Sequence, residues 1–158
     1  MKSQTASKTG VVLYITGLVL FLVFLGVFRD KLNNYASQRI KVTSGSSTHL
    51  LAETKIDSAY NYSKNKLPYK ITFLEFGTKG CSACKNMELV MEKVKQQHPT
   101  RVNVVFVNLL LPENRIYMNY FGIATIPTQI LLNSEGKEYY RHSGYISFEK
   151  LNIHLTSK

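Results

Sequence analysis

Cysteine is scarce in this sequence: only Cys81 and Cys84 carry a thiol among its 158 residues. A zinc site needs about four ligands, so one pair of cysteines supplies at most half of such a site. The other half would have to come from the histidines, and their spacing shows no pair. These histidines are His49, His98, His142 and His154. We therefore expect no metal and no other cofactor, which leaves a redox pair or a pair of inert thiols.

Charged and amide side chains are absent from residues 10–28, which read GVVLYITGLVLFLVFLGVF. A bilayer core needs about 20 apolar residues in a helix, so this run predicts a transmembrane helix or an uncleaved signal anchor in the lipid bilayer. A cleavable signal peptide has an apolar core of about 7–15 residues followed by a small-x-small site. The longer run, with no clean site after it, favours an anchor behind an N-terminal tail of residues 1–9.

A basic stripe is also lacking, although the formal net charge is +10. Residues 1–44 hold six basic residues and one acidic residue, and residues 45–158 hold fourteen and nine, so each part carries +5. Without a basic cluster or a known motif, the sequence predicts a solvated basic surface and no nucleic-acid partner. The basic residues at 29–41 could instead contact anionic lipid head groups.

The length remaining after the apolar run suits one domain of about 100 to 120 residues. Residues 29–48 are expected to form a juxtamembrane segment and linker. Within this segment, residues 29–41 would continue the membrane helix or lie at its rim. Residues 42–48 (VTSGSST) are small and polar enough for a flexible tether. The folded domain is therefore expected over residues 49–158.

Hydrophobic periodicity predicts alternating strands and helices in this domain. The apolar runs at 71–76 and 102–107 are typical of buried strands. Apolar side chains between Cys84 and Pro99 fall on one face of a helix that Pro99 ends. These side chains are Met87, Val90, Met91 and Val94. The other expected elements are helices over 50–63, 112–121 and 147–156, and strands over 128–132 and 137–142 joined by a turn at 133–136.

The two cysteines stand at C-x-x-C spacing between an apolar run and a helical pattern. Two thiols at this spacing can form and break one disulfide. If Cys81 begins the helix, unpaired N–H groups and the positive end of the helix dipole favour its thiolate, the form that attacks a disulfide. Lys79 and Lys85 flank the pair and are expected to favour the thiolate as well.

Residues 67–156 resemble the thioredoxin superfamily in three motifs. These are FGTKGCSACK at 76–85, GIATIPT at 122–128 and Gly144. With an acidic residue in the preceding strand, the CxACK pattern is most similar to the C-terminal domain of the disulfide reductase DsbD and its membrane-tethered relatives. The resemblance implies an α/β thioredoxin fold, with a central mixed sheet of four to five strands flanked by helices, behind an N-terminal transmembrane helix.

The resemblance also implies catalytic roles for three residues. Cys81 would be the exposed nucleophile that forms a mixed disulfide, and Cys84, one helical turn further on, would resolve it. Glu75 lies where the family carries a buried acid, and a raised pKa would suit it to accept the proton of Cys84. The alternative for Glu75 is a residue at the end of a strand with its carboxylate in solvent.

A substrate-docking groove follows from the same resemblance. Pro127 matches the cis-proline of the family, although a trans proline at the start of a strand is the alternative. The expected substrate-binding residues are Gly80, Ile126, Pro127 and Thr128. Gly80 and Ala83 replace the Trp and Pro of the common WCGPC motif, and Gly77 replaces a bulky residue. The site is therefore expected to be less covered and its helix start less rigid.

The implied activity is that of a membrane-anchored thiol:disulfide oxidoreductase that reduces extracytoplasmic protein disulfides, with apocytochrome c among the candidate substrates. One cysteine pair cannot relay electrons across a bilayer, so a membrane electron donor of the DsbD or CcdA type is implied. Flanking charge alone would place the C-terminal part inside, but long domains translocate with little regard to charge. By analogy, we expect a single-pass protein of the cytoplasmic (inner) membrane whose domain faces the periplasm.

Two other functions remain open. A disulfide-forming oxidase would reverse the electron flow, but the span from Asn108 to Pro127 is too short for the large helical insertion of DsbA-type enzymes. A thioredoxin-like structural subunit of a membrane complex would use the fold for binding alone. The measured reduction potential separates reductase from oxidase.

Overall fold

The computed structural model describes residues 5–43 and 46–157. The chain divides into two compact units, which meet between Tyr35 and Ala36 and are described separately here. The limits predicted for the linker and the folded domain, at residues 29, 48 and 49, stay predictions.

The N-terminal unit is helical and contains the expected apolar segment. Helix α1 (Thr5–Thr43) includes Gly10–Phe28, which alone among the described residues is long and apolar enough to cross a membrane. The side chains of residues 10–27 are all exposed, so the protein itself leaves this apolar surface uncovered. Membrane anchors and N-terminal signal sequences share these properties. The predicted apolar helix is confirmed as a candidate transmembrane span.

The structure differs from the flexible tether predicted over 42–48. Helix α1 continues to Thr43 and helix α2 (Ser46–Tyr60) starts at Ser46, while residues 44 and 45 lie outside the described residues. Serine and threonine are favoured where helices begin, so the small polar residues of this segment suit the first turn of α2. Further along α2, Ala52 and Ile56 are buried in the core. The packing of α2 against the core therefore keeps its first residues helical, although their composition suits a flexible linker.

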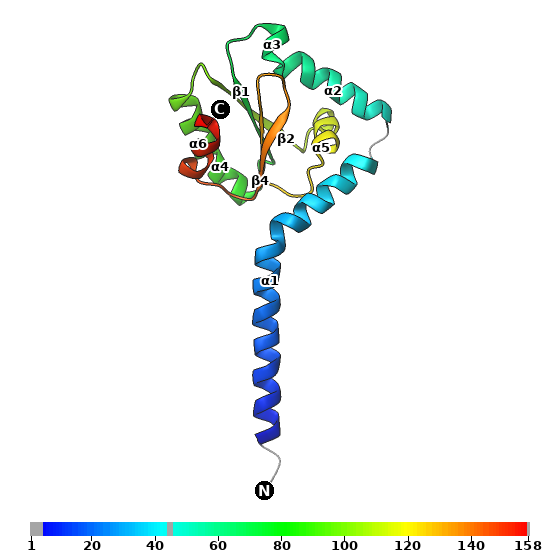
Figure 1. Ribbon diagram of the computed structural model, residues 1–158, viewed down its shortest axis with the longest axis vertical. Coiled ribbons are helices and arrows are strands. Elements are labelled where there is room, and N and C mark those ends of the chain that lie inside the picture. The colour runs from blue at the N-terminus through cyan, green and yellow to red at the C-terminus, as the bar shows by residue number, and fades with distance from the viewer. Residues whose placement is uncertain (1–4, 44–45, 158) are drawn as a thin grey trace. The chain divides into compact units, whose positions relative to one another are not determined.

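The domain is built on a four-stranded mixed sheet with the order β2-β1-β3-β4 (Figure 1). Strand β1 (Ile71–Gly77) pairs in parallel with β2 (Val102–Asn108) and antiparallel with β3 (Thr128–Leu132), which pairs antiparallel with β4 (Glu138–Ser143). All seven residues of β1 are buried, as expected for a central strand covered on both faces. The predicted thioredoxin fold is confirmed.

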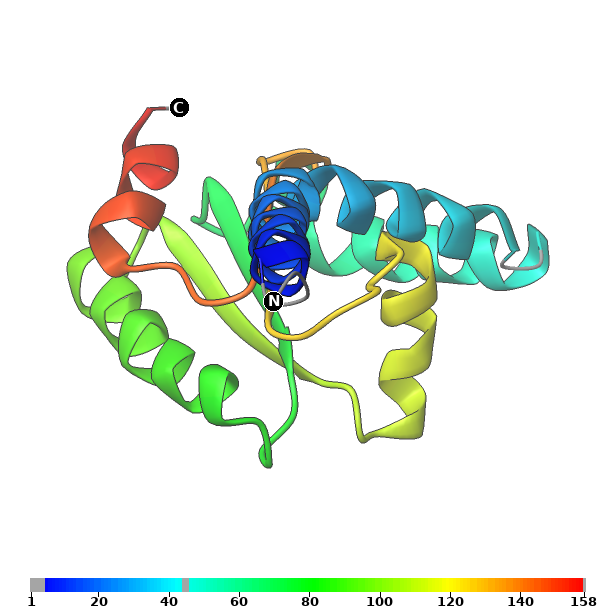
Figure 2. The same cartoon turned by 90° about the horizontal axis from the view of Figure 1, so that it is seen from below.

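Helices cover both faces of the sheet, which Figure 2 shows edge-on between them. Helices α4 (Ser82–Gln97) and α6 (Phe148–Thr156) pack on one face, with Ile71, Phe73 and Leu131 of the sheet. Helices α2 and α5 (Arg115–Phe121) pack on the other face, with Leu74 and Phe76. The α4 side chains predicted to form one apolar stripe all belong to the first of these cores.

The ends of the helices follow local sequence signals. Ser147 caps α6 by accepting a hydrogen bond from the Lys150 N–H. Helix α5 follows a short 3-10 turn, η1 (Pro112–Asn114), and ends at Gly122, whose φ of 61° suits glycine. A short helix, α3 (Tyr62–Asn65), separates α2 from β1 and was not predicted.

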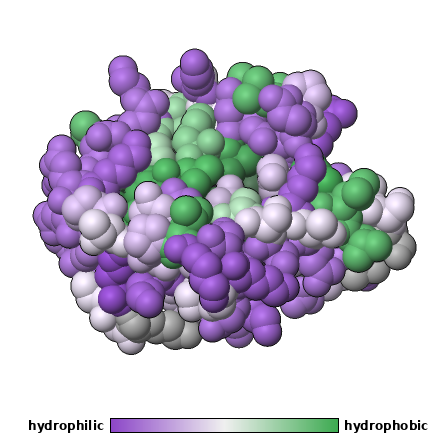
Figure 3. All heavy atoms as spheres, turned by 90° about the horizontal axis from the view of Figure 1, so that it is seen from above, coloured by the Kyte–Doolittle hydropathy of each residue, from purple (hydrophilic) through white to green (hydrophobic). Residues whose placement is uncertain are grey.

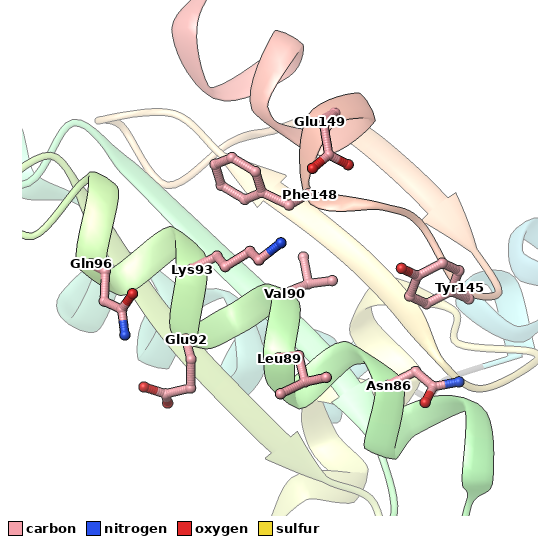
Figure 4. A pocket seen from close by; sticks show the side chains of 9 residues that line it. All are labelled: Asn86, Leu89, Val90, Glu92, Lys93, Gln96, Tyr145, Phe148 and Glu149. Atoms are coloured by element: carbon pink, nitrogen blue, oxygen red, sulfur yellow. The ribbon is translucent and has the colours of Figure 1, made fainter.

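Two hollows lie on the surface of the domain. A groove of about 600 Å³ runs between α4 and α6, where Val90 and Lys93 point toward α6 and Phe148 lines the opposite wall (Figure 4). A smaller hollow of about 310 Å³ lies where β1 begins, lined by Lys70, Ile71, Arg101, Asn133, Ser134 and Tyr139. Figure 3 shows hydrophobic side chains gathered within a largely hydrophilic face of the molecule. Because β1 begins at the smaller hollow, that hollow lies at the opposite end of the sheet from the cysteines.

Candidate functional site

Strand β1 leads through a short loop to Cys81, which is the first residue before helix α4. Cys81 has an extended backbone, and its Sγ accepts a hydrogen bond from the Cys84 N–H at 3.2 Å. A hydrogen bond from the Cys84 thiol, followed by bonds from the backbone N–H groups of Cys84 and Ala83, lowers the pKa of Cys81 below its ordinary value. Cys81 is only half-buried. The start of the helix thus leaves this sulfur accessible and favours its thiolate, the form that attacks disulfides.

Cys84 lies one turn further along α4 and is 2% exposed. Burial raises the pKa of the Cys84 thiol to about 11, and its hydrogen bond to Cys81 and the negative charges of Cys81 and Glu75 act in the same direction. The pair therefore combines an accessible sulfur with a lowered pKa and a buried sulfur with a raised pKa. This difference suits Cys81 to attack a partner protein first and Cys84 to react only afterwards.

Gly77, the last residue of β1, makes room for the buried thiol. A Cβ at this position would lie 3.1 Å from Cys84 Sγ and 3.1 Å from Phe106 Cε2. The sequence showed Gly77 only as a departure from the bulky residue of the family. Its packing against Cys84 depends on how β1 and α4 meet, and the sequence motif carries no sign of this contact.

Glu75 lies two residues before Gly77, on the same face of β1, and is fully buried. The pKa of Glu75 is raised to about 8, mainly because the carboxyl group is buried. A hydrogen bond from Gln129 lowers this pKa, and the charge of Cys81 raises it. The solvent-exposed alternative for Glu75 is therefore wrong. A carboxyl group that titrates near neutral pH can exchange a proton with a nearby thiol.

Gln129 is the site residue that the sequence analysis missed. It lies opposite Glu75 in the pairing of β3 with β1, is fully buried, and donates from Nε2 to Glu75 Oε1 at 3.4 Å. An amide side chain in the apolar run TQILL was the available signal. Its partner lies 54 residues away in the sequence, so only the fold brings the two together.

The expected docking residues lie where β1 ends and β3 begins. The Ile126–Pro127 peptide bond is cis, as predicted, and Thr128 pairs with Phe76 beside the loop to Cys81. Gly144 donates its N–H to the Pro127 carbonyl at 2.7 Å, which ties the end of β4 to this turn. Pro127 and Thr128 are buried, Ile126 is half-buried, and Gly80 is exposed with open space around it. Their role in binding stays a prediction.

The charged residues expected to tune the site are on the surface. Lys79 and Lys85 are both exposed, and their effect on Cys81 stays a prediction. His98 caps the end of α4, and its Nε2 is 2.6 Å from Asn152 Oδ1, as expected for a helix-end residue. Within residues 5–43 and 46–157, no three histidine, cysteine or carboxylate side chains gather where they could hold a metal ion.

Comparison with known families agrees with this geometry. A family model described as a thioredoxin-like domain matches residues 58–157, which is more than half of the chain. The chain therefore belongs to the thioredoxin-like family, and thiol–disulfide exchange is the chemistry general to this family. The narrower resemblance to DsbD stays a prediction.

The chain is also similar to two plant proteins named thioredoxin-like protein HCF164, chloroplastic. The protein from Arabidopsis thaliana is 27% identical over 122 residues, which cover 70% of this chain and 47% of that protein. The protein from Oryza sativa subsp. japonica is 30% identical over 118 residues, which cover 67% and 45%. The chain thus spans about half the length of the curated relatives it matches.

Solved structures share the fold at lower sequence identity. A thioredoxin-2 described as a component of the malaria parasite protein secretion machinery has a TM-score of 0.52 and 24% identity, covering 56% of this chain and 84% of that one. A mutant thioredoxin from Halobacterium salinarum NRC-1 has a TM-score of 0.54 and 19% identity, covering 66% and 82%. These likenesses establish the fold of the domain.

Proposed function

We propose that this chain is a membrane-anchored thiol:disulfide oxidoreductase that reduces disulfides of extracytoplasmic proteins. The observation that carries the proposal is the contrast between Cys81, accessible with a lowered pKa, and Cys84, buried with its pKa raised to about 11. The two sulfurs would otherwise compete for the same substrate. Their different environments support attack by Cys81 and resolution by Cys84.

The reaction proceeds in two exchanges. The Cys81 thiolate attacks one sulfur of a substrate disulfide, so that a mixed disulfide forms and the other substrate sulfur leaves as a thiolate. Cys84 then loses its proton and attacks Cys81, which forms the Cys81–Cys84 disulfide and releases the second substrate sulfur. The two substrate thiolates take up protons from water. Two electrons have passed from the protein to its substrate.

Glu75 is the proposed acceptor of the Cys84 proton. While Cys81 is a thiolate, its charge raises the pKa of Glu75, and the buried acid tends to remain protonated. A mixed disulfide removes that charge, so the carboxylate fraction of Glu75 increases when Cys84 must lose its proton. The S–H bond of Cys84 breaks as an O–H bond forms on Glu75. The base thus becomes available at the second exchange.

Substrate docking is proposed at the turn that precedes β3. The proposed docking residues lie at the end of the sheet where the chain leaves β1 for Cys81; they are Ile126, Pro127 and Thr128. Thr128 pairs with Phe76 of β1. Gly80 precedes Cys81 in the chain, and there is open space where a side chain at Gly80 would lie. An extended segment of a substrate protein would place its disulfide over the accessible sulfur with little obstruction.

Membrane attachment and a separate electron donor complete the proposal. The apolar segment Gly10–Phe28 supports a membrane anchor. The proposed location is the cytoplasmic membrane, with the domain on the periplasmic or other extracytoplasmic side. That compartment is oxidising, so a reductase there must be reduced again after each turnover. A membrane protein of the DsbD or CcdA type, which passes electrons outward, is the proposed donor. The anchor would keep the domain close to it.

Trapping of the mixed disulfide tests this function. In Cys84→Ser, Cys81 can attack but nothing resolves the product, so proteins linked through a reducible bond should accumulate on the full-length chain in membranes. Cys81→Ser is the matched control and should trap none. Periplasmic thiol proteins in the trapped fraction support the proposal. Equal recovery from both variants, or none from either, contradicts it.

The reduction potential decides the direction of electron flow. A reductase should equilibrate near the thioredoxin end of the scale, about −270 mV, and an oxidase near −120 mV. Only the 3-10 turn η1 and helix α5 occupy the span from Asn108 to Pro127, which supports the reductase. A potential near −120 mV would overturn the proposed direction while leaving the exchange chemistry intact.

A further inference from the structure

The face of the sheet below helix α4 carries a polar pair in an otherwise apolar surface. Glu75 of β1 and Gln129 of β3 lie opposite each other in the antiparallel register, and both side chains are 0% exposed. Their neighbours on this face include Ile71, Phe73 and Leu131, which belong to the core. Burying two polar side chains in such a place costs free energy unless each finds partners.

The hydrogen bonding of this pair is incomplete in one specific way. Gln129 Nε2 donates to Glu75 Oε1, while Glu75 Oε2 and Gln129 Oε1 are buried and unpartnered. Both unpartnered atoms are oxygens, so neither can donate to the other as they stand. A proton on Glu75 Oε2 would supply the missing donor, and one O–H bond to Gln129 Oε1 would satisfy both atoms. An unpaired buried atom of this kind calls for an explanation.

We propose that Gln129 is a positioning residue that pairs with Glu75 in both of its protonation states during the second thiol exchange. It donates to the carboxylate through Nε2 and accepts from the carboxylic acid through Oε1. Glu75 can therefore take the Cys84 proton without turning and without leaving its new O–H unpaired. This inference rests on the proposed function, because it assigns a role in the step that resolves the mixed disulfide.

The proton balance of the step is simple. The Cys84 S–H bond breaks, an O–H bond forms on Glu75, and the Cys84 sulfur attacks Cys81 as the substrate thiolate leaves. When a dithiol donor later reduces the Cys81–Cys84 disulfide, Cys84 becomes the leaving sulfur and Glu75 returns the proton to it. Gln129 changes the hydrogen bond it uses at each transfer, and it gains or loses no proton itself.

Few other ionisable groups face Glu75. At the start of α4, the charge of Cys81 raises the pKa of Glu75, and the charge of Glu75 in turn raises the pKa of Cys84. Across the sheet, the row through Glu75 continues to Phe106 on β2 and, beyond Gln129, to His142 on β4. His142 is the other ionisable side chain in this row, so the rates are also measured in a His142→Gln background.

The second exchange can be followed directly with 5,5′-dithiobis(2-nitrobenzoate). Attack by Cys81 releases a first thionitrobenzoate in a phase that depends on reagent concentration. Attack by Cys84 on the mixed disulfide releases a second in a phase that does not. Stopped-flow absorbance of the reduced full-length chain in detergent, recorded from pH 5 to 10, gives both rates. The first phase reports Cys81 alone.

Gln129→Met should change only the second phase. The substitution keeps the side-chain length but removes the Nε2 donor to the Glu75 carboxylate. That bond to the charged group is stronger than the bond from the neutral acid to Gln129 Oε1, so its loss disfavours the carboxylate. We expect the second phase to slow about tenfold at pH 7, and its pH midpoint to rise by about one unit, with the first phase unchanged. Leu131→Met, on the same face of the same strand, is the matched control and should leave both phases unaltered.

A second variant keeps the test decisive if Gln129→Met is poorly folded. Gln129→Glu retains a polar side chain of the same length and places a second carboxyl group against Glu75, so the midpoint should rise further. A second phase unchanged in a folded Gln129 variant, while Glu75→Gln slows it, would overturn the role of Gln129 and leave the proposed function standing. Absence of any second phase in the unmodified protein would instead contradict the proposed function.

Discussion

Gly77 is the residue on which the burial of Cys84 depends most directly. A Cβ there would lie 3.1 Å from Cys84 Sγ, a distance closer than ordinary van der Waals contact. We expect Gly77→Ala to lower the free energy of unfolding by about 1–3 kcal/mol, because overpacking forces buried neighbours to move. Gly80→Ala is the control, since its Cβ would meet nothing within 4 Å. Denaturant unfolding followed by circular dichroism should rank Gly77→Ala well below Gly80→Ala; equal stabilities would refute the packing role.

Glu75 makes the stability of the domain depend on pH. Its pKa in the folded protein is raised to about 8 from an ordinary value near 4.5, so the folded state holds a proton that the unfolded state has lost. The contribution of Glu75 to the free energy of unfolding is therefore fully present below about pH 4.5 and is lost as the pH rises to about 8. We expect the free energy of unfolding to fall by a few kcal/mol over this interval.

Glu75→Gln isolates this contribution, because glutamine keeps the shape and cannot titrate. The difference in unfolding free energy between the two proteins should change steadily from pH 5 to 8, while the contribution of the cysteines largely cancels. A difference that stays constant across this range would show that Glu75 titrates at its ordinary value.

Residues with a chemical signature were predictable from the sequence. Cys81 and Cys84 are marked by their spacing, Glu75 by its charge in an apolar strand, and Pro127 by the motif around it. Gln129 matters through a cross-strand contact with Glu75, which no local pattern displays. The sequence therefore indicated the proposed site residues but not the buried hydrogen-bond partner of Glu75.

Helix α4 begins directly after the candidate nucleophile, which also caps the helix. Cys81 is its N-cap, and the Cys81 sulfur accepts a hydrogen bond from the Cys84 N–H. Serine at this position can still accept that bond, whereas alanine cannot. We expect Cys81→Ala to be less stable than Cys81→Ser by about 1 kcal/mol in denaturant unfolding, although both variants lack redox activity. Identical stabilities would mean that the sulfur contributes nothing as a cap.

The order of strands and helices was predictable because each has a local period. The buried strands appear as apolar runs, and the α4 stripe recurs at helical spacing. The segment 42–48 was predicted less well, since small polar residues suit both a linker and the start of a helix. Only the burial of Ala52 and Ile56, further along α2, decides for the helix.

For the whole molecule, the apolar part of α1 is the candidate membrane span, and its role can be tested directly. If residues 10–28 anchor the protein, the full-length chain should stay with membranes after an alkaline carbonate wash, and deletion of 10–28 should release it. A membrane-impermeant maleimide applied to intact cells should label Cys81 if the domain lies outside the membrane. Loss of an N-terminal tag together with release of the intact domain would identify a cleaved signal peptide and overturn the anchor.

The most direct test of the account is the pH dependence of alkylation at each cysteine of the reduced full-length protein. Mass spectrometry after brief exposure to iodoacetamide, from pH 4 to 10, gives a separate rate for each sulfur. We expect Cys81 to react with a midpoint below the ordinary cysteine value of about 8.5, and Cys84 to stay almost unmodified throughout. Preferential modification of Cys84, or a Cys81 midpoint at or above 8.5, would contradict it.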